Sequence, residues 1–145
     1  MIPMPEAAVA TFLESYNCSQ AVLSAFAERS GLDRSTALRL ASPFGGGLAR
    51  RGEVCGAVTG ALMALGLARG TDTPASKDEI YRLSRELMGQ FEARHGSILC
   101  RALIDCDIST PAGHQAAADK GVFRSICPGL VREAAEILQE LLEKA

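Results

Sequence analysis

Cysteine is the residue type in this sequence that is best suited to do chemistry. The 145 residues include five cysteines: Cys18, Cys55, Cys100, Cys106 and Cys127. No two of them have the C-x-x-C spacing of a zinc ribbon or a thioredoxin-type site, so a shared site must be assembled from distant segments. Such cysteines ligate metals, carry out redox catalysis or fill a core as inert thiols. The inert role is the commonest one for a single cysteine taken alone.

Cys55 has the sequence context of a reactive thiol. We expect a helix to begin near residue 53, which places Cys55 in its first turn directly after Arg50 and Arg51. The positive end of a helix dipole and nearby arginines both lower the pKa of a thiol, so we predict a low pKa for Cys55. Cys127 has a similar context at the start of the last expected helix. The alternative is that both residues simply fill tight contacts between helices.

Small residues recur at every fourth position after Cys55: Gly56, Gly60 and Ala64. On a helix they form one smooth ridge that lets a neighbouring helix approach closely. This explains why glycine is present despite its cost of about 0.5–1 kcal/mol relative to alanine in a helix. Close approach could bring Cys18 or Cys100 within disulfide reach of Cys55. Tight core packing without a disulfide is the other interpretation, and the two are compatible.

The run Gly45-Gly46-Gly47, followed by Arg50 and Arg51, could cradle an anion ahead of a helix. It lacks the lysine of a Walker motif and any preceding strand, which argues against a nucleotide loop. A plain flexible turn is the favoured interpretation.

The two histidines, His95 and His114, could ligate a metal. His95 lies near the end of a long expected helix, where a cation is favourable for the dipole. His114 lies in a short polar helix. A solvated or capping role is favoured for each.

Helical spacing of apolar residues runs through nearly the whole chain. Asp33 and Thr110 are expected N-caps, Gly31 and Gly96 are expected helix ends, and Ser76 with Glu79 resembles a capping box. The sequence therefore predicts an all-α fold: a compact bundle of five to six helices that forms one domain over residues 1–145. The expected helices cover residues 6–29, 33–40, 53–66, 76–95 (with about two further turns over 97–104 after the interruption at Gly96), 110–121 and 128–144.

Composition restricts the classes of function. The net charge of −2, the absence of Trp and the 5% content of aromatic residues give no reason to expect nucleic acid as a partner. The N-terminal segment does not read as a signal peptide. The longest apolar stretch, residues 54–68, contains three glycines and is too short to span a bilayer. We therefore expect a cytoplasmic protein without membrane insertion.

Several separated motifs, taken in order, resemble the C_GCAxxG_C_C family of redox-active proteins, which is named for four cysteines and a C-G-A-x-x-G motif. They are NCSQAVL (17–23), FGGG (44–47), CGAVTGAL (55–62), GSILCR (96–101) and Cys127-Pro128, and the resemblance covers residues 16–142. It implies that Cys18, Cys55, Cys100 and Cys127 are the functional set. Cys106 lies outside the pattern and is expected to be an accessory or incidental thiol.

Three functions remain open at this point. The first is thiol–disulfide exchange or electron transfer with an unknown redox partner protein, in which Cys55 is the nucleophile and Cys18 or Cys100 resolves the mixed disulfide. The second is a four-thiolate site for an iron–sulfur cluster or zinc, ligated by Cys18, Cys55, Cys100 and Cys127. The third is a helical interaction module, such as a homodimer, whose thiols are inert.

Overall fold

The computed structural model describes residues 2–144, which are mostly helical and contain no β-strand. The α-helices are α1 (Met4–Leu13), α2 (Cys18–Ala27), α3 (Arg34–Ala41), α4 (Gly56–Arg69), α5 (Lys77–His95), α6 (Cys100–Leu103), α7 (Pro111–Asp119), α8 (Val122–Ser125) and α9 (Cys127–Lys144). The predicted all-α class is confirmed. The predicted number of five to six helices is too low, because a turn divides residues 6–29 into two helices and because α8 lies outside every expected helix.

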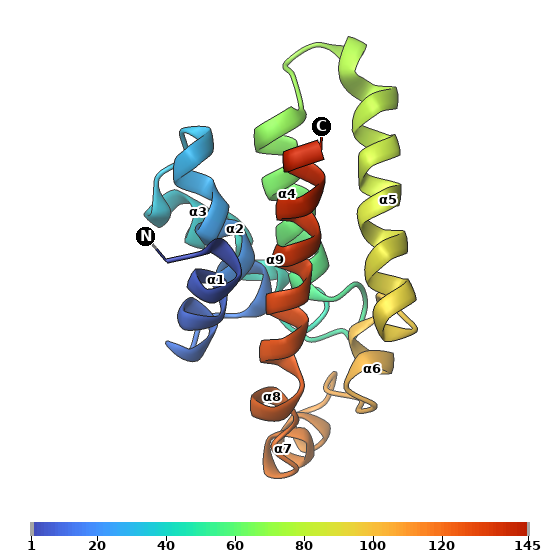
Figure 1. The fold of residues 1–145 in the computed structure, drawn as a ribbon. Helices are drawn as coiled ribbons and strands as arrows, with labels where there is room; N and C mark the ends of the chain where they lie inside the picture. Colours follow the sequence, from blue (N-terminus) through green and yellow to red (C-terminus); the bar gives the residue numbers. More distant parts are fainter. Residues whose placement is uncertain (1, 145) are drawn as a thin grey trace.

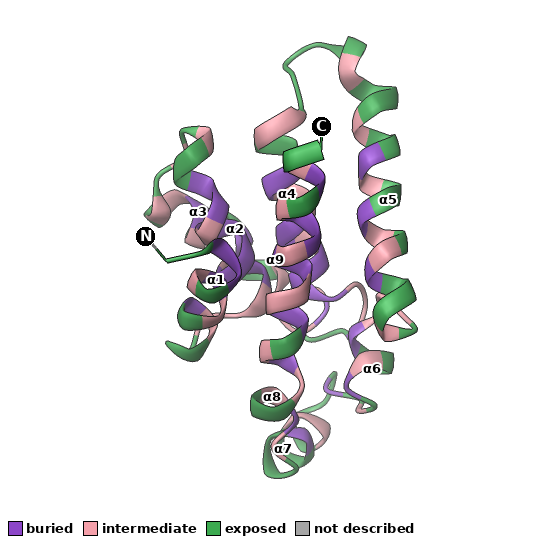
Figure 2. Cartoon of the chain, viewed as in Figure 1, coloured by how far each residue is buried: buried purple, intermediate pink, exposed green. Residues whose placement is uncertain are grey.

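Three long helices form the centre of the molecule. Helices α4, α5 and α9 lie side by side, with α5 antiparallel to the other two (Figure 1). Helices α1 and α2 pack against one side of α4 and α9, α3 packs on α2, and the short helices α6–α8 lie at one end. Buried residues gather on α2, α4 and α9 where these helices meet (Figure 2). A second, smaller hydrophobic cluster joins α6, α7 and α8 to the start of α9.

The helix predicted over residues 6–29 is in fact two helices, α1 and α2. The chain turns at Ser15, whose φ is 79°. Asn17 then caps α2: its side-chain oxygen accepts a hydrogen bond from the Gln20 N–H at 2.9 Å, and the Gln20 side chain accepts one from the Asn17 N–H at 3.0 Å. This reciprocal capping box satisfies two backbone donors at the new helix start. As a consequence, Cys18 is the first residue of α2 and does not lie within a longer helix.

The other helix ends follow the sequence signals in most cases. Asp33 and Thr110 cap α3 and α7 as predicted, and Gly31 and Gly96 end helical segments in left-handed conformations. The capping box predicted at Ser76 is wrong. Ser76 ends a short 3-10 turn, and its hydroxyl accepts a hydrogen bond from the Thr71 N–H at 3.3 Å.

Residues 97–104 were expected to be helical, but only Cys100–Leu103 form a helix. The residues before it are extended because Leu99 forms an isolated antiparallel bridge with Val54. A tertiary contact therefore overrides the local pattern.

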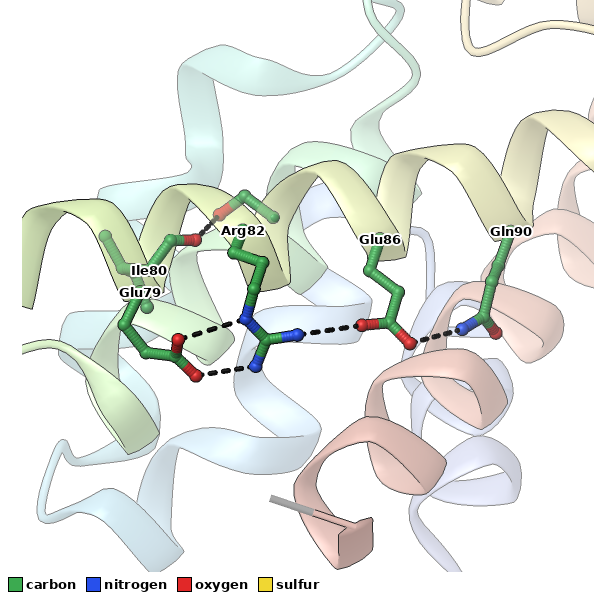
Figure 3. Close-up of polar contacts among 6 residues, drawn as sticks. Glu79, Ile80, Arg82, Glu86 and Gln90 are labelled. Carbon is green, nitrogen blue, oxygen red and sulfur yellow. Dashed lines mark hydrogen bonds and ion pairs between the residues drawn. The ribbon is translucent and has the colours of Figure 1, made fainter.

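Helix α5 shows how the bundle meets solvent. Along its exposed face, Arg82 donates hydrogen bonds to both carboxylate oxygens of Glu79, at 2.6 and 3.0 Å, and lies 3.6 Å from Glu86 (Figure 3). The Gln90 amide continues the row by donating to Glu86 at 3.4 Å. The opposite face buries Leu83, Leu87 and Phe91. None of the helices in residues 2–144 is long and apolar enough to cross a membrane.

The glycine ridge of α4 packs directly against the first turn of α2, as the sequence predicted. A Cβ atom on Gly60 would lie 2.6 Å from the Ser19 carbonyl oxygen and 3.0 Å from its Cα. A Cβ atom on Gly56 would lie 3.0 Å from the Ser19 N and 3.2 Å from the Cys18 Cβ. The two helices can therefore touch through their backbones only because these positions lack side chains.

We expect Gly60→Ala to destabilise the protein by about 2–3 kcal/mol, because the new methyl group must displace the backbone of α2. Gly66 is the matched control on the same helix, since a Cβ added there meets no atom within 4 Å. Gly66→Ala should stabilise the protein by about 0.5–1 kcal/mol through helix propensity alone. Chemical denaturation followed by circular dichroism measures both changes. Equal effects of the two substitutions would contradict a tight contact at Gly60.

Candidate functional site

Four of the five cysteines lie at the starts of helices. Cys18, Cys100 and Cys127 are the first residues of α2, α6 and α9, and Cys55 is the N-cap of α4. Cys55, Cys100 and Cys127 are buried, whereas Cys18 is partly exposed. All four line one cavity of about 670 Å³. The structure therefore brings together the whole set that the family resemblance implied.

The cavity lies between the two hydrophobic clusters of the molecule. Cys55 belongs to the main core, Cys100 and Cys127 belong to the smaller cluster, and Cys18 packs against both. The fifth thiol, Cys106, packs against the smaller cluster but does not line the cavity. The expectation that Cys106 stands apart from the other four thus agrees with its position.

The backbone holds Cys55 and Cys100 through the Val54–Leu99 bridge. The Cys55 N–H donates a hydrogen bond to the Ile98 carbonyl at 2.8 Å, and the Cys100 N–H donates one to the Glu53 carbonyl at 2.7 Å. These two bonds flank the bridge on its two sides. The helix expected to begin near residue 53 therefore begins only at Gly56, because residues 53–55 take part in this pairing.

The glycine run Gly45-Gly46-Gly47 leads into a left-handed turn at the edge of the cavity. Every residue from Gly46 to Arg50 has a positive φ, including the non-glycine residues Leu48 (68°), Ala49 (51°) and Arg50 (64°). Each such residue costs roughly 1–2 kcal/mol in an L-amino acid chain. Backbone hydrogen bonds hold the turn closed, since the Gly52 and Glu53 N–H groups donate to the Gly46 and Gly47 carbonyls at 3.1 and 2.9 Å. The expected turn is present, and its strain is concentrated beside the cysteines.

Gly47 allows this turn to touch a cysteine. A Cβ atom on Gly47 would lie 2.7 Å from the Cys100 Cβ and 2.6 Å from the Glu53 N. Gly45 has the same role at the other side, where an added Cβ would lie 2.7 Å from the Asn17 Cβ, next to Cys18. The glycine run is thus required for close packing around the cavity.

The predicted low pKa of Cys55 is wrong. Burial raises the pKa of this thiol from 9.0 to about 12, and the backbone N–H groups of Ala57 and Val58 offset only part of that effect. Burial likewise raises the pKa of Cys100 to about 11, with further contributions from Cys127 and Cys106. Both thiols therefore keep their protons at neutral pH.

The thiol with the lowered pKa is Cys127. Hydrogen bonding with the Cys18 side chain lowers the pKa of Cys127 below 9.0, despite an opposing effect of burial. The same hydrogen bond, followed by burial and by repulsion from Cys55, Cys127 and Cys100, raises the pKa of Cys18 well above its ordinary value. The cause of the lowered pKa is a neighbouring thiol and not the helix start that the sequence suggested. Within this pair, Cys127 is the thiol that ionises more readily and Cys18 is the one that keeps its proton longer.

Sequence reasoning missed several other residues of the cavity wall. Tyr16, Asn17, His114 and Phe123 line it, and the His114 ring lies 5.2 Å from the Phe123 ring between centroids. His114, predicted to be solvated or capping, is therefore part of the site. His95 is not: it ends α5, and its Nε2 lies 2.8 Å from a Glu133 carboxylate oxygen. Asn17 belongs to the NCSQAVL motif, but no spacing pattern in the sequence indicates that it lines the cavity with Tyr16, His114 and Phe123.

Across residues 2–144, no three His, Cys, Asp or Glu side chains are arranged to hold one metal ion. The four thiols share a cavity, but their present side-chain positions do not form a ready coordination site.

The comparisons with known proteins agree with this geometry. The family described as "Putative redox-active protein (C_GCAxxG_C_C)" matches residues 16–141. The chain belongs to the C_GCAxxG_C_C family. Comparison with curated proteins and with solved structures gives no match. The predicted resemblance, which covered residues 16–142, is thereby confirmed, and the cavity of this C_GCAxxG_C_C protein contains the four cysteines of the family pattern.

We expect alkylation of Cys127 by iodoacetamide to reach half its maximal rate below pH 9, because Cys18 stabilises its thiolate. Cys18→Ala removes the hydrogen-bond donor and should move the midpoint to higher pH. Cys106→Ala is the control and should leave it unchanged. Peptide mass spectrometry measures the rate at each cysteine. A midpoint that Cys18→Ala does not move would contradict the assigned pair.

The raised pKa of Cys55 also predicts a loss of stability at alkaline pH. Above about pH 9 the unfolded chain releases the Cys55 proton while the folded protein retains it, so the free energy of unfolding falls as pH rises toward 12. The contribution is about 1.4 kcal/mol per pH unit for each such thiol. Denaturation at several pH values should therefore give a shallower alkaline decline for Cys55→Ala than for the wild type. Parallel declines would show that Cys55 ionises in the folded protein.

Proposed function

We propose that this protein carries out thiol–disulfide exchange through a reversible disulfide between Cys127 and Cys18. The observation that supports it is the placement of both thiols on one cavity, where their interaction lowers the pKa of Cys127 and raises that of Cys18. A thiolate is the attacking species in exchange, and a second thiol nearby resolves the mixed disulfide once it has lost its proton.

The exchange proceeds in two displacements. The Cys127 thiolate attacks one sulfur of a substrate disulfide; a mixed disulfide forms, the substrate S–S bond breaks, and one substrate thiolate leaves. Cys18 then passes its proton to that thiolate and attacks the Cys127 sulfur. This step forms the Cys18–Cys127 disulfide and expels the second substrate thiolate, which takes a proton from solvent. The substrate gains two electrons and the protein loses two.

Cys55 and Cys100 do not begin this exchange. Their pKa values of about 12 and about 11 leave them protonated at neutral pH. A pKa of about 11 lies two units above the ordinary 9.0. Each unit corresponds to about a tenfold smaller thiolate fraction near neutral pH. The nucleophile originally predicted, Cys55, is therefore replaced by Cys127 in the proposal.

A four-thiolate site for an iron–sulfur cluster or zinc is the second candidate. Its support is the convergence of Cys18, Cys55, Cys100 and Cys127 on one cavity, since four thiolates complete the ligand set of either group. Repulsion among the cysteines helps to raise the pKa values of Cys18, Cys55 and Cys100, and a bound cation would offset that repulsion. The side chains would have to rotate to coordinate one metal.

The exchange proposal predicts distinct products from single cysteine variants. All are made in a Cys106→Ser background, which removes the partly exposed thiol outside the cavity. Oxidation of the reduced parent protein by bis(hydroxyethyl) disulfide should yield a Cys18–Cys127 disulfide, located by peptide mass spectrometry. Cys127→Ser should slow the reaction by about tenfold or more, because burial still raises the pKa values of Cys18, Cys55 and Cys100. Cys18→Ser should stop at a mixed disulfide on Cys127.

The matched control is Cys55→Ser, which should retain rapid exchange. Loss of exchange in Cys55→Ser together with its retention in Cys127→Ser would overturn the assignment. Iron, zinc and sulfide analysis of protein purified without oxygen tests the second candidate, for which a stoichiometric metal is expected. Unreactive thiols without a stoichiometric metal would favour the interaction module.

A further inference from the structure

The charge on the cavity wall is opposite to that of the whole chain. The protein has 17 acidic and 15 basic residues, which gives a net charge of −2. The cavity is lined by Arg50 and Arg124, and no Asp or Glu of the described residues lines it. A cavity with cations and no carboxylates attracts a ligand of negative charge.

The two arginines are free to bind such a ligand. Both are exposed, and neither has a carboxylate partner within ion-pair distance in residues 2–144. Their neighbour Arg51, by contrast, lies 3.6 Å from Glu53. Arg50 belongs to the left-handed turn, where its N–H donates to the Gly45 carbonyl at 3.0 Å. Arg50 therefore lies in a strained turn, with a φ of 64°, and its unpaired guanidinium belongs to a residue that lines the cysteine cavity.

The backbone around the cavity carries partial positive charge, as the two arginines carry full positive charge. Helices α2, α4 and α9 all begin at cavity-lining cysteines, so the positive ends of three helix dipoles meet there. Gly46 and Gly47 also line the cavity, and their N–H groups have no acceptor among the described residues. These backbone groups add to the positive potential of the two arginines.

The depth of the thiols restricts the size of a substrate. Cys127 is 7% exposed and Cys55 is 3% exposed, so a disulfide held on the surface of a folded protein cannot reach them. A volume of about 670 Å³ lies within the usual range of cavities for small molecules, roughly 300–1,000 Å³. Several rim residues, such as Leu13 and Ala49, are exposed, which leaves the cavity open to solvent.

We propose that the substrate of the cysteine cavity is a small disulfide that carries carboxylates, which Arg50 and Arg124 bind while Cys127 attacks its S–S bond. This inference rests on the proposed exchange function and names the substrate class. The chemistry is the balanced pair of displacements described above. Two carboxylate-bearing thiols are released, and the Cys18–Cys127 disulfide remains in the protein.

Three small disulfides differ in charge but share the same core structure, so they test the effect of substrate charge. Dithiodipropionate, bis(hydroxyethyl) disulfide and cystamine share an S–S bond with two ethylene arms and end in carboxylate, hydroxyl and ammonium groups. We expect the reduced protein to react fastest with dithiodipropionate and slowest with cystamine. Each rate is divided by the rate of the same disulfide with mercaptoethanol, which removes differences in intrinsic reactivity. Equal normalised rates, or the reverse order, would overturn the proposal.

Arginine variants locate the source of the preference. Arg50→Gln and Arg124→Gln should each reduce the ratio of the dithiodipropionate rate to the bis(hydroxyethyl) disulfide rate by about threefold, and the double variant by about tenfold. Arg85→Gln is the matched control, because Arg85 is exposed on α5, has no ion-pair partner in residues 2–144 and does not line the cavity. A similar loss in Arg85→Gln would assign the preference to net charge and overturn the proposed site.

Binding without chemistry separates this inference from the exchange function. Suberate has the length and charge of dithiodipropionate but no S–S bond, and octanediol is its neutral counterpart. Calorimetric titration should show binding of suberate that is weakened in the Arg50→Gln/Arg124→Gln variant, and no binding of octanediol. Suberate binding without any disulfide exchange would support the anion site and refute the exchange function. Exchange without suberate binding and without charge preference would refute the anion site alone.

Discussion

The close contact between α2 and α4 is the constraint on which the rest of the site depends. Gly56 and Gly60 let the backbone of Ser19 pack directly onto α4, and this contact sets the start of one helix beside the start of the other. Cys18 and Cys55, which begin these helices, then face the same cavity. Gly45 and Gly47 allow the same kind of close contact with Asn17 and Cys100, respectively. The glycines of this C_GCAxxG_C_C protein are thus placed where a side chain would push a cysteine-bearing segment away from the others.

Burial raises the pKa of a thiol at these helix starts, whereas the helix dipole lowers it. The magnitudes of the two effects explain which thiol ionises most readily. At an exposed helix end the dipole is worth about 0.3–1 kcal/mol, and up to about 2 kcal/mol when partly buried. Raising the pKa of Cys55 from 9.0 to about 12 corresponds to about 4 kcal/mol, so burial prevails. Arg50 and Arg51 are exposed and solvated, which weakens their effect on the thiol. The pKa of Cys127 is lowered despite burial, because the interaction with the Cys18 side chain favours its ionised form.

The parts of the structure that the sequence predicted are those set by local chemistry. Asp33 and Thr110 could be recognised as N-caps, since the groups they satisfy lie three residues away. The turn at Ser15 could not be recognised, because the residue with the positive φ of 79° is a serine and no glycine or proline marks the break between the helices. The family pattern identified the four cysteines, but their pairing depends on contacts between distant segments. The low pKa assigned to Cys55 failed for the same reason, because burial is a tertiary property that spacing does not reveal.

The two pairs of thiols differ in how readily they lose a proton, and oxidation of one pair therefore affects the other. Cys18 is the partly exposed thiol and Cys127 is the thiol with the lowered pKa, whereas Cys55 and Cys100 keep their protons at neutral pH. Part of the raised pKa of Cys100 and Cys55 comes from repulsion by Cys127. A Cys18–Cys127 disulfide is uncharged, so its formation removes that repulsion and makes Cys55 and Cys100 easier to ionise. The disulfide also carries no negative charge, so Arg50 and Arg124 on the cavity wall remain available to a released carboxylate. Oxidation of Cys18 and Cys127 therefore changes the electrostatics of the whole cavity, because four thiols and two cations share one small volume.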